Sequence, residues 1–238
     1  MSIKIVMKEE VPRNAVFVTG FQGIGITGYI AVRHMVAALN AKPIGFVLLK
    51  RMPPFVWMDG NRLATPIQLF KHGSHVFMLV EFMPSPSELY RFINRICNWC
   101  ATNFSEALLM GGLDLRVKKD GEVEKAKFAA TSQAISKVLD KGYKVLDTGL
   151  YVTGPLALML MKFEQLGFPA IAILSYANPS RPDPMAAAVA IEYFSKMYDV
   201  KVETDELIKD AQRIEAEIEE NLKRKQEKIK SEATTLYI

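Results

Sequence analysis

Cysteine is scarce in this chain and long apolar runs are absent, and each shortage excludes a class of protein. Two cysteines in 238 residues cannot build a disulfide framework. No apolar stretch approaches the roughly 18 residues that a membrane-spanning helix requires. Residues 1–4 also lack the charged-then-apolar layout of a secretory signal. We therefore expect a cytoplasmic protein that has no membrane partner.

A strong excess of one charge is also missing. The 30 Lys and Arg residues exceed the 26 Asp and Glu residues by a net charge of +4, which is too small to indicate a nucleic-acid partner. Half of the residues are hydrophobic and 24% are charged, the balance of an ordinary globular protein. At this length a folded chain buries about 70% of its surface, which allows a sizeable core.

Short apolar runs alternate with segments of helical periodicity along most of the chain. Residues 16–19 predict a buried strand, residues 24–39 a helix, and residues 44–49 a second strand that is a parallel neighbour of the first, as in a βαβ unit. Polar residues 118–127 predict an exposed excursion. The other expected elements are a hairpin of residues 55–58 and 62–64, strands at 75–81, 107–110, 144–146 and 170–174, and helices at 84–102, 132–139, 154–166 and 183–197. This order predicts a single α/β core domain, residues 1–202, with a mixed, mostly parallel sheet flanked by helices.

The composition changes after the core domain. We expect a projecting C-terminal helix over residues 203–230, because Lys and Glu dominate beyond residue 222 and leave little to bury. Its apolar stripe consists of Leu207, Ala211, Ile214, Ile218 and Leu222. Residues 231–238 are expected to form a flexible tail.

The tail ends in Leu236, Tyr237 and Ile238, three largely apolar side chains whose exposure to water does not stabilise the folded protein. One interpretation is a tail that folds back onto the surface of its own chain. The other is a tether that presents an anchor to another protein. In that case leucine fills an apolar slot, tyrosine offers a ring and a hydroxyl, and a lysine or backbone amides capture the terminal carboxylate.

A glycine-rich segment lies between the first predicted strand and the first predicted helix. Gly23, Gly25 and Gly28 match the fingerprint of dinucleotide-binding folds, in which amides at a helix N-terminus hold a pyrophosphate. The acidic residue that should bind the ribose is missing, because Lys50 and Arg51 follow the second strand instead. These bases would suit the 2′-phosphate of NADP. Tight turning and close packing of the helix on the strand explain the glycines without a ligand, so cofactor binding is the weaker interpretation.

No other motif assembles a catalytic or metal site. Cys97 and Cys100 have redox spacing but fall late in a predicted helix, which favours buried, inert thiols. The three histidines, His34, His72 and His75, lack the spacing of a zinc site. A nucleophile elbow and a Walker P-loop are both absent. We expect a protein that is not an enzyme and that holds neither a cofactor nor a metal.

Several segments, taken in order, resemble the proteasome assembly chaperone family in its archaeal branch. The resemblance covers most of the chain and is carried by Gly20-Phe21-Gln22-Gly23-Ile24-Gly25, Phe128-Ala129-Ala130-Thr131, Thr153-Gly154-Pro155-Leu156, Gly167-Phe168-Pro169-Ala170, Arg181-Pro182-Asp183-Pro184-Met185-Ala186-Ala187-Ala188 and Val202-Glu203, followed by the helix with Leu207, Ala211, Ile214 and Glu215. It implies a fold like that of the purine nucleoside phosphorylases, without a catalytic set. It also implies an ATP-independent role in the assembly of proteasome α-subunits.

The terminus Leu236-Tyr237-Ile238 resembles the hydrophobic–tyrosine–any-residue signature of proteasome activators and some assembly chaperones. The resemblance implies that the motif inserts between adjacent α-subunits, where its carboxylate meets a lysine. Burial of Leu236 stabilises a complex by about 1.5–3 kcal/mol, so a single tail binds weakly. Several tails on a homo-oligomer raise the avidity by roughly 10²–10⁴. We therefore expect a homo-oligomer that binds proteasome α-subunits or the α-ring through these residues. The alternative is an enzyme of nucleoside or nucleotide chemistry, or an NADP-binding enzyme, that uses the glycine-rich loop.

Overall fold

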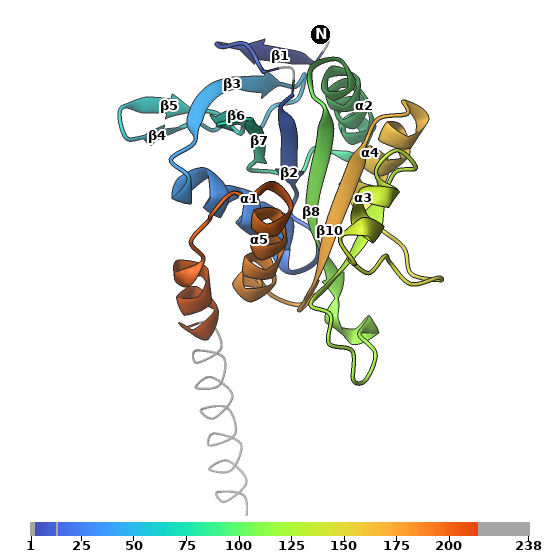
Figure 1. Cartoon of the computed structure of the whole chain (residues 1–238). Helices are drawn as coiled ribbons and strands as arrows, with labels where there is room; N and C mark the ends of the chain where they lie inside the picture. Colours follow the sequence, from blue (N-terminus) through green and yellow to red (C-terminus); the bar gives the residue numbers. More distant parts are fainter. Residues whose placement is uncertain (1–2, 13, 214–238) are drawn as a thin grey trace, which may run out of the picture.

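A mixed sheet of eight strands runs through the centre of the computed structural model, which describes residues 3–12 and 14–213 (Figure 1). The strands are β1 (Lys4–Met7), β2 (Val16–Gly20), β3 (Lys42–Leu48), β6 (Ile67–His72), β7 (His75–Val80), β8 (Glu106–Asp114), β9 (Ala126–Ala130) and β10 (Ala170–Ala177). Their order across the sheet is β1-β3-β6-β7-β2-β8-β10-β9. The central pairs β7–β2, β2–β8 and β8–β10 are parallel, and the outer pairs are antiparallel. Five of the eight strands thus run in one direction, which confirms the predicted α/β fold.

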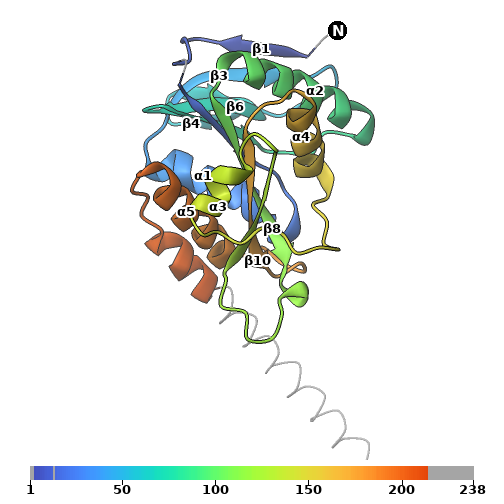
Figure 2. The ribbon, with the colours of Figure 1, turned by 45° about the vertical axis from the view of Figure 1, so that its right-hand side comes forward.

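Helices cover both faces of this sheet (Figure 2). On one face lie α2 (Pro86–Asn103) and α4 (Gly154–Gln165), and on the other lie α1 (Thr27–Ala38), α3 (Ile135–Asp140) and α5 (Pro184–Tyr198). Side chains of a strand point alternately to the two faces. Accordingly Phe17 of β2 packs with α2 and α4, whereas its neighbour Val18 packs with α1 and α5. The sheet is therefore buried on both sides.

The order of the strands differs from the prediction at one point. We predicted that the second strand is a parallel neighbour of the first, but β6 and β7 lie between β3 and β2. These two strands form a hairpin whose turn is Gly73-Ser74, with Gly73 at a φ of 55°. The hairpin lies beside β2 because β7 and β2 form a parallel pair, which begins with Val16 opposite His75.

Several strand boundaries also differ. Strand β8 continues to Asp114, although Gly111 and Gly112 were expected to end it. Glycine is needed at both positions, because Leu156 lies against Gly111 and the backbone of Ile24 lies against Gly112, which leaves no room for a Cβ atom. Strands β1, β6 and β9 were not predicted, and the strand expected at 144–146 is a single bridge to β9. The excursion 118–127 was expected to be exposed, but its last two residues, Ala126 and Lys127, are buried in β9.

A predicted hairpin stands apart from the main sheet. It consists of β4 (Trp57–Asp59) and β5 (Arg62–Ala64), joined by Gly60-Asn61 with Gly60 at a φ of 58°. A positive φ is the conformation that favours glycine in tight hairpin turns. Met58 and Leu63 pair across the strands and are both about 60% exposed. The hairpin thus presents an apolar surface to solvent.

The C-terminal helix begins at residue 205, two residues after the predicted start. Residues 205–213 are helical, Leu207 is buried in the core cluster that includes α1 and α5, and Ala211 is also buried. The rest of the predicted helix 203–230 and the tail 231–238, with Leu236, Tyr237 and Ile238, lie outside the described residues, so the predictions for them stay predictions. Across residues 3–12 and 14–213 no helix is long and apolar enough to cross a membrane.

Candidate functional site

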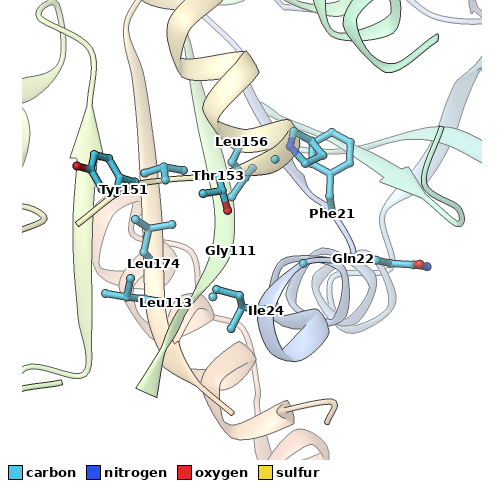
Figure 3. A pocket seen from close by; sticks show the side chains of 14 residues that line it. Phe21, Gln22, Ile24, Gly111, Leu113, Tyr151, Thr153, Leu156 and Leu174 are labelled. Atoms are coloured by element: carbon cyan, nitrogen blue, oxygen red, sulfur yellow. The ribbon is translucent and has the colours of Figure 1, made fainter. Parts of the chain in front are cut away.

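A pocket opens at the carboxyl edge of the parallel strands. The chain leaves β2 towards β3 on one side of the sheet and leaves β8 towards β10 on the other, so β2 and β8 flank a topological switch point. Ligands of open α/β sheets bind in the crevice at such a point. The pocket there has a volume of about 280 Å³ and lies between the loop after β2, the end of β8 and the start of α4 (Figure 3).

The lining of this pocket is mainly apolar. Figure 3 shows the side chains of Ile24, Leu113 and Leu174 on one side and those of Phe21 and Leu156 on the other. None of the lining residues is a carboxylic acid, a histidine, a lysine or an arginine. General acid–base chemistry needs a titratable group within hydrogen-bond reach of the substrate. The pocket therefore suits an uncharged group and lacks the usual acid–base residues for turnover of a nucleotide.

The glycine-rich loop contributes Gly23 to the pocket, whereas Gly25 and Gly28 serve the packing of the fold. A Cβ atom at Gly28 would lie 2.9 Å from the carbonyl carbon of Met110 in β8 and 3.1 Å from the Cα of Gly20 in β2. Gly25 adopts a φ of 59°, and its carbonyl oxygen accepts a 2.8 Å hydrogen bond from the amide of Asp183. Helix α1 thus approaches the sheet closely through glycine, as the interpretation without a ligand expects.

The start of α4 forms one rim of the pocket. Thr153 precedes the helix and makes no side-chain capping bond, and its hydroxyl points towards Gly111 in Figure 3. Gly154 has a φ of 68° and Pro155 occupies the first turn, where the missing amide hydrogen costs nothing. Lys50 and Arg51, the bases considered for the phosphate of NADP, do not line this pocket. The parts of an NADP site are therefore not brought together.

A buried ion cluster holds the walls of this edge in place. Lys127 of β9 pairs with Glu122, and both side chains are 7% exposed. Lys127 also lies 3.3 Å from a carboxylate oxygen of Asp147, and the Tyr176 hydroxyl donates a 3.0 Å hydrogen bond to Glu122. The hydrogen bond from Lys127 lowers the pKa of Glu122 to about 2, and burial raises the pKa of Tyr176 to about 12. The cluster stays charged at neutral pH and fixes the excursion against β10.

Sequence reasoning missed this cluster. The run of polar residues at 118–127 indicates solvent exposure when its charges are counted alone. The alternation in β9, where Lys127 precedes the buried Phe128, is too short to separate a strand from a loop.

A second polar group lies at the opposite edge of the sheet. His75 is 5% exposed and packs edge-on against Phe194 and Tyr198 at ring distances of 5.2 Å. Burial and the nearby His72 lower the pKa of His75 below its ordinary value. The other charged groups that face it are Glu106 and Lys137, which form a 2.6 Å ion pair. Because its ring is buried among these side chains, we assign His75 to the core.

The remaining candidate residues of the sequence fall in the core or on its surface. Cys97 and Cys100 are fully buried in α2, and burial raises the pKa of Cys97 to about 12, as expected for inert thiols. His34 contacts the carbonyl oxygen of Glu203 at 2.7 Å. Within residues 3–12 and 14–213, no group of three or more His, Cys, Asp or Glu side chains is arranged to hold a metal ion.

Comparison with known proteins finds relatives that match this chain over most of their own length. An uncharacterized protein of Methanocaldococcus jannaschii is 25% identical over 225 residues, which cover 92% of this chain and 90% of the relative. Among solved structures, Pyrococcus furiosus PbaA, described as an archaeal homolog of proteasome-assembly chaperone, superposes with a TM-score of 0.82 at 20% identity over the full length of both chains. Pyrococcus furiosus PbaB, described as an archaeal proteasome activator, gives a TM-score of 0.73 at 16% identity over 92% of this chain and 98% of PbaB.

These structural likenesses establish the fold. The family model of the PAC2 family matches residues 17–222, which include the glycine-rich loop, the whole sheet from β2 onward and the start of the C-terminal helix. The chain belongs to the PAC2 family.

Proposed function

We propose that this protein is an ATP-independent proteasome assembly chaperone or docking factor that binds proteasome α-subunits through Leu236, Tyr237 and Ile238. The observation that carries the proposal is a hydrophobic–tyrosine–any-residue ending on a chain of the PAC2 family. The fold shared with a chaperone homolog and a proteasome activator supports a role at the proteasome. The proposal includes a cytoplasmic location.

The domain organisation in this proposal separates the scaffold from the anchor. Residues 1–202 form the rigid core, residues 203–230 a helix and residues 231–238 the tail that carries the anchor. Leu207 packs in the core and attaches the start of the helix to it, so the proposed tail begins from a fixed point on the molecule. From residue 214 the proposed helix adds 17 residues, about 25 Å at 1.5 Å per residue, and an extended tail of 8 residues adds about 27 Å.

Binding energy from one tail is small. A buried leucine supplies about 1.5–3 kcal/mol, and the tyrosine ring with the carboxylate contact about doubles it. The resulting dissociation constant is in the high-micromolar to millimolar range. A homo-oligomer that presents several tails on one face gains roughly 10²–10⁴ in avidity without a new contact. The proposed active form is therefore a homo-oligomer.

Capture of purified proteasome α-rings on the immobilised full-length protein tests this function. Deletion of Leu236-Tyr237-Ile238 should abolish capture, and Leu236→Ala and Tyr237→Ala should each weaken it by at least about tenfold. The matched control is Thr234→Ala, because Thr234 lies in the tail but outside the three residues that bind. Undiminished capture by the deletion variant would refute the role of the tail.

The competing function is an enzyme of nucleotide chemistry, but the pocket has few of the groups that such an enzyme needs. The lining carries no charged side chain that would hold a phosphate, and two of the three fingerprint glycines serve packing. A thermal-shift screen against nucleosides, nucleotides and NADP should give no stabilisation. A stabilising ligand whose effect disappears in a Leu113→Trp variant, which fills the pocket, would favour the enzyme.

A further inference from the structure

Gly23 lines the 280 Å³ cavity between the loop after β2, the end of β8 and the start of α4, which we call the switch-point pocket. A fold requires glycine where φ is positive or where a Cβ atom would clash. At Gly23 φ is −118°, and a Cβ atom would meet nothing within 4 Å. Neither the backbone nor the packing therefore requires glycine here. Its effect is to leave bare backbone beside the pocket, which allows a ligand to approach closely.

The end of β8 presents a second stretch of accessible backbone to the same pocket. Strand β2 ends at Gly20, opposite Met110, whereas β8 continues to Asp114 beside β10. Beyond Met110, no strand of the described residues lies next to β8 on the side of β2. Residues 111–113 of this edge line the pocket. Buried backbone amides and carbonyls need hydrogen-bond partners, and here a strand does not supply them.

Two side chains at the pocket add hydroxyl groups. Figure 3 shows Thr153 between Tyr151 and Phe21, which lie at opposite ends of the pocket. Neither the Thr153 hydroxyl nor the Tyr151 hydroxyl takes part in a hydrogen bond within residues 3–12 and 14–213. Tyr151 is also 81% exposed, so its ring contributes little to the core of the protein. An aromatic ring in this place can instead pack on an apolar ligand.

The volume and the lining define the class of ligand. An apolar cavity of about 150 Å³ holds a benzene molecule. The switch-point pocket has nearly twice that volume, which suits a bicyclic ring or a single ring with a short substituent. Pockets for larger, drug-sized ligands start at about 300 Å³. A charged ligand would lose its hydration without gaining a counter-charge, because the lining has no acid, histidine, lysine or arginine.

We propose that the switch-point pocket binds a small, uncharged aromatic molecule. Its ring lies between the apolar walls, and an amide or hydroxyl substituent forms hydrogen bonds with the Thr153 hydroxyl and the backbone edge of β8. The ligand is bound and not converted, since the pocket lacks an acid–base group. The inference does not depend on the proposed role at the proteasome, because the pocket is part of the core domain and the proposed anchor consists of the last three residues of the chain.

Saturation-transfer NMR on the full-length protein tests the pocket with three indoles of almost equal size. Indole-3-acetamide is uncharged and should bind with a dissociation constant of roughly 0.1–1 mM, as expected for a ligand of this size. Indole-3-acetate is an anion and tryptamine is a cation at neutral pH. Both should bind at least about tenfold more weakly, because the lining offers neither of them an opposite charge.

Three variants locate the bound molecule. Gly23→Leu should abolish binding of indole-3-acetamide and still fold, because open space surrounds this position. Tyr151→Ala should weaken binding by about two- to tenfold through the loss of the ring contact. Tyr90→Ala is the matched control and should leave binding unchanged, because Tyr90 is also well exposed, at 67%, but lies outside the pocket. Circular dichroism melts establish that each variant is folded.

Each outcome supports or overturns the proposal. Binding of indole-3-acetamide that is lost in Gly23→Leu and kept in Tyr90→Ala supports it. If the wild-type protein shows no binding at about 5 mM, the proposal is wrong. It is also wrong if Gly23→Leu leaves binding unchanged, or if either charged indole binds more tightly than the amide. Capture of proteasome α-rings should be the same for Gly23→Leu and the wild type, so this proposal and the proposed function can fail separately.

Discussion

The packing of Gly28 against the sheet predicts a large effect from a single methyl group. In the Gly28→Ala variant the new Cβ would lie 2.9 Å from the carbonyl carbon of Met110 and closer still to its oxygen. Because backbone atoms lie on both sides, at Met110 and at Gly20, no side chain can move to relieve the contact. Helix α1 has to shift by several tenths of an ångström or more, which disturbs the packing of Val32 and Met35 below it.

The magnitude follows from two opposed terms. Overpacking of a well-packed core costs about 1–3 kcal/mol, with the upper end expected where backbone is involved. Alanine is the better helix former by about 1 kcal/mol, which offsets part of the cost. The net loss of about 1–2 kcal/mol lowers the melting temperature of a domain of this size by about 2–8 °C. The matched control is Gly23→Ala, since a Cβ at Gly23 meets nothing within 4 Å and its φ is −118°.

Thermal denaturation followed by circular dichroism measures both variants. The Gly23→Ala variant should melt within about 1 °C of the wild type. A Gly28→Ala variant as stable as the wild type would refute the packing explanation of the fingerprint. Equal destabilisation by both substitutions would refute it as well, because only one of the two positions is packed.

Two further predictions concern the polar clusters. Lys127→Met should lower the melting temperature clearly more than Lys119→Met, because it leaves the buried Glu122 without a cation, whereas Lys119 is 68% exposed and pairs only with the partly exposed Asp147. Equal melting temperatures would show that the cluster does not hold the excursion. Burial lowers the pKa of His75 below the ordinary value of 6.5. As the pH falls through about 6.5, His75 therefore binds a proton in the unfolded chain but not in the folded chain. The free energy of unfolding, measured in urea between pH 7.5 and pH 5, should therefore decrease on acidification, and less steeply in His75→Phe; parallel curves for the two proteins would contradict the assignment.

The sequence predicted most elements correctly where apolar runs were long or bounded by strong signals. Helix α5 begins as expected because Asp183 caps it by accepting a 3.0 Å hydrogen bond from the amide of Ala186. The β4–β5 hairpin was predictable from its Gly60-Asn61 turn. Strand β6 was missed because its six residues include Gln68 and Lys71, and Gln68 is buried only through the tertiary fold. Strand order could not be predicted, since nothing local places the β6–β7 hairpin beside β2.

The candidate site, like the fold, was predicted from the sequence only in part. The sequence located the glycine-rich loop at a strand-to-helix turn, and the loop does border the pocket at the carboxyl edge. It could not distinguish a loop that holds phosphate from one that lets a helix approach a sheet, because both require glycine at the same spacing. The contacts of Gly28 with Met110 and Gly20 fit both kinds of loop, whereas the lining of the pocket, which has no Lys, Arg or His to hold a phosphate, favours the second. The role of the last three residues depends on a partner, and no fold of the chain alone can reveal it.

Photo-crosslinking from position 237 tests the central claim most directly. Replacement of Tyr237 by benzoylphenylalanine keeps an aromatic ring in the tail and reports, on irradiation with proteasome α-rings, which protein surrounds it. The account predicts cross-links to α-subunit residues at the junction of two adjacent subunits, lost when an excess of unlabelled tail peptide is added. Cross-links confined to the protein's own core domain in the presence of α-rings would contradict it.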